Sequence, residues 1–346
     1  MKTYKNLFSQ IIQFKNILEA SYKAAKGKRE RPYVMDFLMH IEENIYLLQD
    51  ELSRQSYCPG SYSTFQIYRP KPRKISAAPF RDRVVHHALI NVIGPLLERS
   101  FIFDSYANRV GKGTHKAIQR YQSFLREYDW VLKCDIQKYF PSIDHEILKS
   151  LFRYKIADSK TLWLIDVIID CSNEQEPVHN YFPGDDLFTP YKRRKGLPIG
   201  NLTSQFFANF YLDPLDHFIK ESLQCKGYLR YVDDFVLFAY DKWQLKEWEQ
   251  RISDFLEKFR LRLNPRAVQL YPSHIGNRFL GQVIYRNKRR LTGENVRRFR
   301  KRLRKWEKVP SENLQQRIAS WVGHAKQADT KALLKSFSNP TINRFL

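Results

Sequence analysis

Residues 229–240, LRYVDDFVLFAY, place two adjacent carboxylates inside a run of aliphatic and aromatic residues. The apolar residues predict two strands joined by a tight turn near Val232 and Asp233. Two-residue hairpin turns need positive φ and favour Asn-Gly or Asp-Gly, so Val-Asp is a poor turn sequence. Local inconsistency of this kind often marks a functional site. The alternative is a surface hairpin on which Asp233 and Asp234 are merely solvated.

A third carboxylate stands near the end of another apolar run. Residues 130–136, WVLKCDI, predict a strand, and Asp135 has no turn glycine beside it. If the two strands are brought together, Asp135 lies beside Asp233 and Asp234, and three carboxylates repel strongly at low local dielectric. Divalent cations remove that repulsion, and Mg²⁺ prefers carboxylate and phosphate oxygens. Two such ions clamp the attacking and leaving oxygens of a phosphoryl transfer. Taken alone, Asp135 fits a loop or helix-cap role equally well.

The remaining notable acids read as structural. Asp144 directly precedes a predicted helix and is expected to cap it, with Ser142 as the alternative cap. Asp185 and Asp186 stand in NYFPGDDLFTP, whose flanks are not strand-like, so we expect a solvated loop.

The chain is strongly basic, with 59 Lys and Arg against 36 Asp and Glu and a net charge of +23. This charge favours nucleic acid as the partner over an anionic membrane surface. No apolar stretch approaches the ~20 residues that span a bilayer, and the first residues do not resemble a signal peptide. The four cysteines lack paired spacing, which argues against a disulfide framework or zinc knuckle and fits a reducing cytoplasm.

Helical and strand-like patterns alternate along the chain, which predicts a mixed α+β fold with a sheet that has helices on one face. Strands or short strands with turns are expected in five segments: 56–80, 130–136, 226–240, 261–272 and 277–286. Helices are expected at 34–53, 80–101, 116–128, 146–154 and 244–259, within 196–223 after its first loop residues, and from 295 onward with a break at Pro310.

The order of these segments resembles the palm of a reverse transcriptase. An aspartate ends one strand, a Tyr-x-Asp-Asp hairpin follows, and a glycine-led loop and helix lie between them. Further blocks resemble the family's in the same order: PKPRKISAAPFRDRVVHHAL, SYANRVGKGTHKA, LPIGNLTSQFFANFYL, NPRAVQL and RFLG. The match spans roughly residues 60–290. It implies a right-hand polymerase fold with an N-terminal helical extension (1–58), fingers (59–130 with part of 150–195), a palm with an antiparallel sheet (131–290) and a helical thumb (291–346).

One block resembles a narrower group. Most bacterial reverse transcriptases, including group II intron and retron enzymes, read close to PQGxxxSP where this chain reads PIGNLTSQ, residues 198–205. Ile199 replaces the glutamine and Gln205 replaces the final proline. The block looks like that of diversity-generating retroelement reverse transcriptases. Those enzymes copy a template-repeat RNA with frequent errors opposite adenine, diversify a variable protein gene and work with a small basic oligomeric accessory variability protein.

The resemblance assigns the catalytic and metal-binding residues. Asp135, Asp233 and Asp234 are expected to hold two Mg²⁺ ions, for which Mn²⁺ can substitute, with the backbone carbonyl of Ile136 assisting. Phe140 is expected to be the steric gate that selects dNTPs over NTPs. The alternative for Phe140 is a core aromatic.

Other positions match the nucleotide-binding part of the family. Lys71 and Arg73 are expected to grip the triphosphate, or alternatively to make general contacts with RNA phosphates. Ile199 and Gly200 are expected at the dNTP. Because Ile199 offers only apolar contact, we expect it to loosen base-pair checking, together with Arg73 and Gln205.

Two basic segments are expected to contact the template RNA and the RNA/cDNA duplex. A helix through 296–306 keeps Val296, Phe299, Leu303 and Trp306 on one stripe and cations around the rest, which suits a thumb helix that follows a phosphate backbone. A solvated face without a partner is the alternative. The expected nucleic-acid contacts are Arg109, Lys112, Arg297, Arg298, Lys301 and Arg304.

The chain departs from the family at one more block, and other functions stay open. The family usually carries a lysine shortly after the position of Asn264, where this chain has Ala267, preceded by Arg266. Arginine is a poor proton donor, so either that role is absent or another group supplies it.

The alternatives to the diversity-generating type are a retron, CRISPR-associated or phage-defence reverse transcriptase, and a catalytically silent RNA-binding protein. Contact with a basic accessory protein is expected through shared RNA or acidic patches such as that of Glu42 and Glu43.

Overall fold

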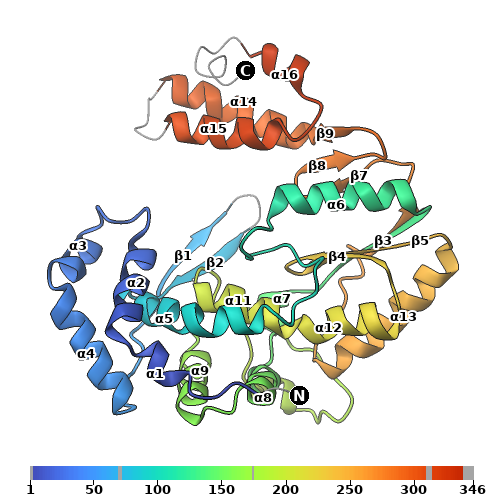
Figure 1. Cartoon of the computed structure of the whole chain (residues 1–346). Helices are drawn as coiled ribbons and strands as arrows, with labels where there is room; N and C mark the ends of the chain where they lie inside the picture. Colours follow the sequence, from blue (N-terminus) through green and yellow to red (C-terminus); the bar gives the residue numbers. More distant parts are fainter. Residues whose placement is uncertain (1–2, 69–71, 174, 309–313, 338–346) are drawn as a thin grey trace. The chain divides into compact units, whose positions relative to one another are not determined.

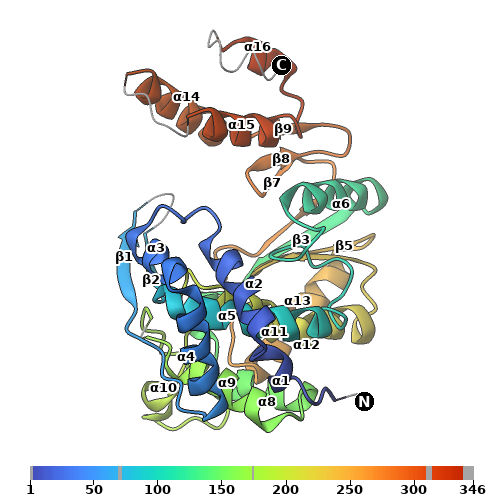
Figure 2. The same ribbon diagram turned by 60° about the vertical axis from the view of Figure 1, so that its left-hand side comes forward.

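The computed structural model describes residues 3–68, 72–173, 175–308 and 314–337. The chain divides into two compact units, each assembled from separate stretches of sequence. The first comprises Met1–Phe103, Ile136–Ser222 and Gln250–Asn264. The second comprises Asp104–Asp135, Leu223–Glu249 and Pro265–Leu346. The elements of both are labelled in Figures 1 and 2.

The first unit is built around the long helix α5, Phe80–Leu97. Helices α2 (Phe14–Ala25) and α11 (Leu202–Tyr211) both pack on α5, and the two views of the chain place them alongside it (Figures 1 and 2). The segment 56–80, in which short strands and turns are expected, contains a two-stranded antiparallel ribbon of β1 and β2. The other helices of this unit are α1 (Phe8–Ile11), α3 (Pro32–Met39), α4 (Ile41–Ser53), α7 (Tyr139–Ser142), α8 (His145–Lys155), α9 (Ser159–Asp170), α10 (Thr189–Lys192) and α12 (Asp213–His217); the strands are β1 (Ser63–Ile67) and β2 (Arg73–Ala77).

The second unit contains a four-stranded antiparallel sheet in the order β4-β5-β3-β6. Its strands are β3 (Trp130–Asp135), β4 (Gly227–Tyr231), β5 (Asp234–Ala239) and β6 (Gln269–Pro272). Helix α6, Thr114–Glu127, lies along one face of this sheet (Figure 1). There Tyr121 and Phe124 pack against Val131, Val236 and Phe238 in one buried cluster. Helix α13, Lys242–Lys258, follows β5.

The expectation of helices on only one face of the sheet is wrong. The residues that alternate with the α6 face, among them Leu132, Cys134 and Leu237, are fully buried too. A sheet covered on both faces needs nearly continuous apolar strands rather than alternating ones. The runs WVLKC and DFVLFA have that pattern, so the signal was present in the sequence.

A smaller antiparallel sheet and three helices follow. Its strands are β7 (Asn277–Phe279), β8 (Gln282–Ile284) and β9 (Arg289–Leu291), and β9 was not expected. The expected strand at 277–286 is a hairpin that turns at Leu280 and Gly281, whose φ values are 45° and 84°. The prediction of helix near 295 is confirmed by α14 (Gly293–Lys308), α15 (Leu314–Ala325) and α16 (Lys331–Lys335). Pro310 lies outside the described residues.

Two expected helices are interrupted. The segment 34–53 divides at His40, whose ψ of 38° leaves the helical region, into α3 and α4. The long helix expected within 196–223 divides into α11, α12 and a π-helical turn over Phe218–Ser222. Pro214 is the second residue of α12, in the first turn, where its missing N–H removes no helical hydrogen bond.

The expected helix cap is confirmed. The Asp144 carboxylate accepts hydrogen bonds from the backbone N–H groups of Glu146 and Ile147 at 3.0 and 3.1 Å. It also lies 2.6 Å from a guanidinium nitrogen of Arg260 and 3.4 Å from Arg193 Nε. Asp144 is completely buried, so the two arginines offset the loss of hydration of its charge.

The expectation of a solvated pair at 185–186 is wrong for Asp185. The Asp185 side chain is 6% exposed, forms an ion pair with Arg193 and accepts a 2.8 Å hydrogen bond from the backbone N–H of Phe182. Asp186 is exposed, as expected. The arginine that buries Asp185 follows eight residues later, and a sequence pattern does not show that the loop brings it back.

Across the residues that the structure describes, no helix has the length and apolar character needed to cross a membrane. All four cysteines are free.

We expect Gly227→Ala to destabilise the second unit. A Cβ at this β4 position would lie 2.9 Å from Phe238 Cβ, 2.9 Å from the Tyr128 ring and 3.0 Å from the Phe238 carbonyl oxygen. Overpacking of this kind lowers the free energy of unfolding by about 1–3 kcal/mol. Gly323→Ala is the matched control, because its Cβ would meet nothing within 4 Å and Ala favours a helix. Thermal unfolding should show a lower midpoint for Gly227→Ala and an equal or higher one for Gly323→Ala; equal midpoints for the parent and Gly227→Ala would contradict the packing.

Candidate active site

The antiparallel pairing of β3 with β5 brings two of the three expected aspartates together. Asp135 is the register partner of Asp234, and Asp234 is in turn the partner of Tyr231 on β4. Residues directly opposite each other in an antiparallel pair project from the same face, with Cβ atoms about 4.5–5.5 Å apart. Asp135, Asp234 and Tyr231 therefore form one row across three strands.

The turn between β4 and β5 consists of Val232 and Asp233, as predicted. Strand β4 ends at Tyr231 and β5 begins at Asp234, so the loop has only two residues. Val232 has a φ of 60°, in the left-handed region. A β-branched residue there is a genuine outlier and carries about 1–3 kcal/mol of strain. The turn places Asp233 directly beside the row formed by Asp234 and Asp135.

A buried arginine supports the strained turn from inside. Arg230 is 0% exposed, and its guanidinium donates a 3.0 Å hydrogen bond to the carbonyl oxygen of Val232. The Arg230 backbone is also bonded on both sides, since its N–H donates to the Asp104 carbonyl and its carbonyl accepts from Tyr106. The guanidinium and the turn it contacts are thus held in place by the neighbouring chain segment. Sequence reasoning missed Arg230, although a cation inside the apolar run YLRYV was a visible signal.

Lys133 is the second residue that sequence reasoning missed. It lies two residues before Asp135 on β3 and so projects from the same face of the sheet. Its Nζ is 3.9 Å from Oδ1 of Asp234, and 21% of its side chain is exposed. A nearby ammonium reduces the repulsion between neighbouring carboxylates. The polar break it makes in WVLKC was the available signal.

The N-terminus of α6 lies at the same row of residues. The hydroxyl of Thr114, the first residue of α6, lies 3.0 Å from the hydroxyl of Tyr231. A helix N-terminus carries partial positive charge, which favours anions within about the first turn. Lys133 therefore places positive charge close to the aspartates, and the helix end lies at the Tyr231 side chain of the same row.

The donor chemistry of the row fits a hard divalent cation. Carboxylate and carbonyl oxygens are the ligands that Mg²⁺ prefers, and Asp135, Asp233, Asp234 and the Ile136 carbonyl supply them. Among the described residues, no group of three or more His, Cys, Asp or Glu side chains is already arranged to hold a metal ion. The assignment of these four residues to Mg²⁺ stays a prediction.

In the first unit, the backbone fixes the position of Ile199. Its carbonyl accepts a 2.9 Å hydrogen bond from the N–H of Ser76 on β2. Asn201, which is buried, accepts from the Ala78 N–H and donates to the Ser76 carbonyl, both at 3.2 Å. Gly200 between them has a φ of 126°, and a Cβ there would lie 3.0 Å from the Ile75 side chain. The loop 199–201 is therefore attached to β2, and Asn201 is a positioning residue that sequence reasoning did not single out.

The other expected nucleotide-binding residues of this unit lie on segments linked to that loop. Arg73 is exposed at the start of β2. Phe140 is half-buried in α7, and its carbonyl accepts a 2.9 Å hydrogen bond from the N–H of Leu197, just before the loop. Gln205 is exposed on α11. Lys71 lies outside the described residues.

The expected nucleic-acid contacts lie in two places of the second unit. Arg109 and Lys112 are half-buried in the loop before α6, where Lys112 Nζ lies 5.2 Å from the centre of the Tyr106 ring. Arg297, Lys301 and Arg304 are exposed on α14. Arg298 on the same helix is half-buried and forms an ion pair with Glu294. Their contact with nucleic acid stays a prediction.

Comparison with known proteins gives a family and several relatives. Residues 66–284 match the family described as reverse transcriptase (RNA-dependent DNA polymerase). The chain is 24% identical over 288 residues to Protein YkfC of Escherichia coli K12, a match that covers 71% of this chain and 72% of that protein. It is 28% identical over 96 residues to Nuclear intron maturase 1, mitochondrial, of Arabidopsis thaliana, covering 28% of this chain but only 14% of the maturase.

A solved structure shows a similar fold. It is that of apo telomerase from Candida tropicalis, truncated from the C-terminal domain, with a TM-score of 0.50 and 15% sequence identity. The similarity covers 70% of this chain and 59% of the telomerase chain.

We expect Val232→Gly to stabilise the hairpin. Glycine adopts positive φ without steric strain, and the relief of about 1–3 kcal/mol exceeds the roughly 0.5–1 kcal/mol that its extra chain entropy removes. Val283→Gly is the matched control, because Val283 is a half-buried strand residue without positive φ. Thermal unfolding should show a higher midpoint for Val232→Gly and a lower one for Val283→Gly. A fall of equal size in both variants would show that Val232 is not strained.

Proposed function

The chain belongs to the reverse transcriptase family of RNA-dependent DNA polymerases, and from this premise we propose that it makes adenine-mutagenic cDNA from a template-repeat RNA. That is the activity of the diversity-generating retroelement type. The observation that carries the proposal is Ile199, which stands where most bacterial relatives have glutamine and whose carbonyl is hydrogen-bonded to β2. An apolar side chain thus occupies a position that the backbone holds in place.

The architecture is interpreted on the same basis. We assign the β4-β5-β3-β6 sheet to the palm, the β1–β2 ribbon to the fingers, and α14, α15 and α16 to a helical thumb. The similarity to a telomerase structure, which concerns fold alone, supports a right-hand polymerase arrangement.

The roles of the aspartates follow from phosphoryl-transfer chemistry. When bound, Mg²⁺ supplies positive charge to the phosphate oxygens and to the attacking hydroxyl. Asp135 and Asp234 would hold the metal from opposite strands, and Asp233 from the turn. Lys133 lowers the repulsion between these carboxylates, and the hydrogen bond from Arg230 keeps the turn in its strained conformation.

The first unit supplies the residues proposed to handle the nucleotide. Arg73 would bind the triphosphate, and the Phe140 ring would exclude a 2′-hydroxyl and so select dNTPs. Ile199 would contact the base pair without a hydrogen bond, so a mismatch there loses no directed interaction. Exposed Gln205 on α11 would act with Ile199 and Arg73 on fidelity.

We also propose a site for the basic accessory protein of this retroelement type. Helix α4 begins with the acids Glu42 and Glu43, next to Tyr46 and Leu47, which are 63% and 61% exposed. An acidic helix with exposed apolar side chains is unusual on a chain of net charge +23. It complements a basic protein surface.

A second candidate is a reverse transcriptase of the group II intron type or another bacterial type. The similarity to YkfC and to an intron maturase favours it. It predicts copying without a special error rate opposite adenine.

We expect Asp233→Asn to reduce primer extension on an RNA template by roughly 100-fold or more, because one charged metal ligand is lost. Asp254→Asn, at an exposed position on α13, is the matched control and should extend like the parent. Extension is measured with Mg²⁺ and a labelled DNA primer. Equal extension by the parent and Asp233→Asn would reject the polymerase proposal and favour a silent RNA-binding protein.

We expect Ile199→Gln to lower misincorporation opposite template adenine several-fold, because a hydrogen-bonding side chain replaces an apolar one. Sequencing of the extension products measures the error frequency at each template base. Ile275→Gln, the same exchange at an exposed position, should leave the errors unchanged. Errors in the parent that are equally rare at all four template bases would support the second candidate instead.

A further inference from the structure

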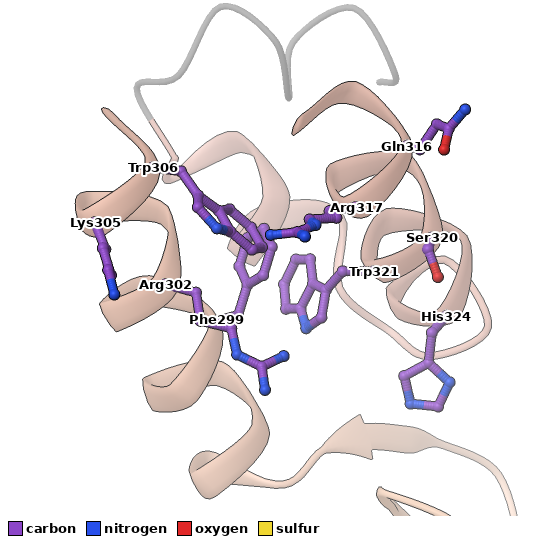
Figure 3. A pocket seen from close by; sticks show the side chains of 9 residues that line it. All are labelled: Phe299, Arg302, Lys305, Trp306, Gln316, Arg317, Ser320, Trp321 and His324. Carbon is purple, nitrogen blue, oxygen red and sulfur yellow. The ribbon is translucent and has the colours of Figure 1, made fainter. Parts of the chain in front are cut away.

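Helices α14 and α15 enclose a cleft that the proposed function does not use. Its volume is about 980 Å³, near the upper end of the roughly 300–1,000 Å³ typical of ligand sites. Figure 3 shows side chains from both helices around it. The nine lining residues are Phe299, Arg302, Lys305, Trp306, Gln316, Arg317, Ser320, Trp321 and His324.

The inner wall of the cleft is aromatic and held in place. The Trp321 and Phe299 rings stack with centroids 3.6 Å apart, and the Trp321 indole N–H donates a 2.8 Å hydrogen bond to Asn295. Trp306 packs against the same buried cluster but, like Trp321, stays partly exposed. The cleft thus presents two indoles with accessible surface, of which Trp321 is held by a ring stack and a hydrogen bond.

The rim is cationic. Arg302 and Lys305 come from α14 and Arg317 from α15, and none of the nine lining residues is acidic. The Arg317 guanidinium lies 5.8 Å from the Trp306 ring centre and points between the two indoles (Figure 3). No described carboxylate forms an ion pair with any of the three cations. Three positive charges therefore surround an aromatic wall without a protein counter-ion among the described residues.

The remaining polar groups of the cleft are neutral. Burial, with a further contribution from His115, lowers the pKa of His324, which favours the neutral ring. His324, Ser320 and Gln316 can each donate or accept hydrogen bonds. They suit the polar edge of a base or a 2′-hydroxyl.

The cations expected to follow a duplex do not line this cleft. At 100° per residue, Arg302 lies on one flank of the stripe through Phe299 and Leu303, and Arg297 and Arg304 lie on the other. Lys301 lies opposite the stripe, one turn before Lys305. Arg297 and Arg304 therefore face away from the side of α14 that carries Arg302.

We propose that the α14–α15 cleft binds unpaired nucleotides of an RNA strand. Arg302, Lys305 and Arg317 would hold successive phosphates, and bases would lie against the Trp306 and Trp321 indoles. Cations combined with aromatic platforms are the usual composition of single-strand sites. An acidic peptide would match the charge but not use the aromatic wall. The inference rests on the proposed function to the extent that this function supplies the RNA.

The test compares two triple variants of the full chain. In the cleft variant, Arg302, Lys305 and Arg317 are each replaced by Gln; in the control, Arg297, Lys301 and Arg304 are replaced in the same way. Fluorescence anisotropy measures binding of a labelled unstructured RNA oligonucleotide and of a blunt RNA/DNA duplex, without primer extension or dNTPs. Thermal unfolding confirms that both variants are folded.

We expect the cleft variant to bind the single-stranded RNA about 10-fold or more weakly than the control variant. The slope of log K against log salt concentration should also be smaller in magnitude by about 2 for the cleft variant, because three phosphate contacts at roughly 0.7 each are lost. A 4-thiouridine oligonucleotide should crosslink to the peptides that carry Trp306 or Trp321. The control variant should instead lose more affinity for the duplex.

Equal losses in both variants for both ligands would overturn the inference, since they would show general charge rather than a site. Stronger competition by polyglutamate than by RNA at the cleft would overturn it in favour of an acidic peptide. If the parent chain extends primers but the cleft variant binds single-stranded RNA as tightly as the control variant does, the cleft proposal alone is rejected. If the parent chain does not extend primers but the cleft variant still binds single-stranded RNA more weakly than the control variant does, the polymerase proposal alone is rejected.

Discussion

The register between β3 and β5 is the constraint on which the candidate active site depends. It sets Asp135 against Asp234 and, on the same face, Val131 against Phe238 under α6. Side chains alternate between faces with a period of two, so a slip of one residue would turn the aspartates away from each other and move the apolar set from under the helix. The buried cluster beneath α6 therefore fixes the register, and the register in turn juxtaposes the two acids. The packing of apolar side chains beneath α6 thus determines the positions of carboxylates several residues away.

The cost of this arrangement is concentrated in a few residues. A valine in the left-handed region and a completely buried guanidinium are each unfavourable in isolation. They occur together because the Arg230 guanidinium donates to the carbonyl of the strained Val232. The repulsion between neighbouring carboxylates is also unfavourable, and Lys133 reduces it because its ammonium lies near one carboxylate of the row. A function that needs several anions at one place explains why a chain would keep these features side by side.

Much of the site was predictable because its signals are local. The turn at Val232 and Asp233 was expected from two apolar runs with acids between them, and Asp144 was expected to cap a helix from its position alone. The features that were not predicted depend on contacts between residues that are not neighbours in the chain. Asp185 is buried by an arginine that the loop brings back, and Asn201 bonds to β2 from more than a hundred residues away. The two buried faces of the sheet were visible as unbroken apolar runs, but helices were expected on one face only.

The sequence by itself determined most of the strands, the tight turn, the acids at strand ends and the family to which the blocks belong. Each of these depends on residue type and short-range spacing, which a single chain displays directly. Only the tertiary structure decided that Asp135 faces Asp234, that Arg230 holds the turn, that Ile199 is fixed to β2 and that two indoles and three cations share one cleft. These depend on contacts between segments far apart in the chain, and long-range pairing is set by the packing of the whole core rather than by any local pattern.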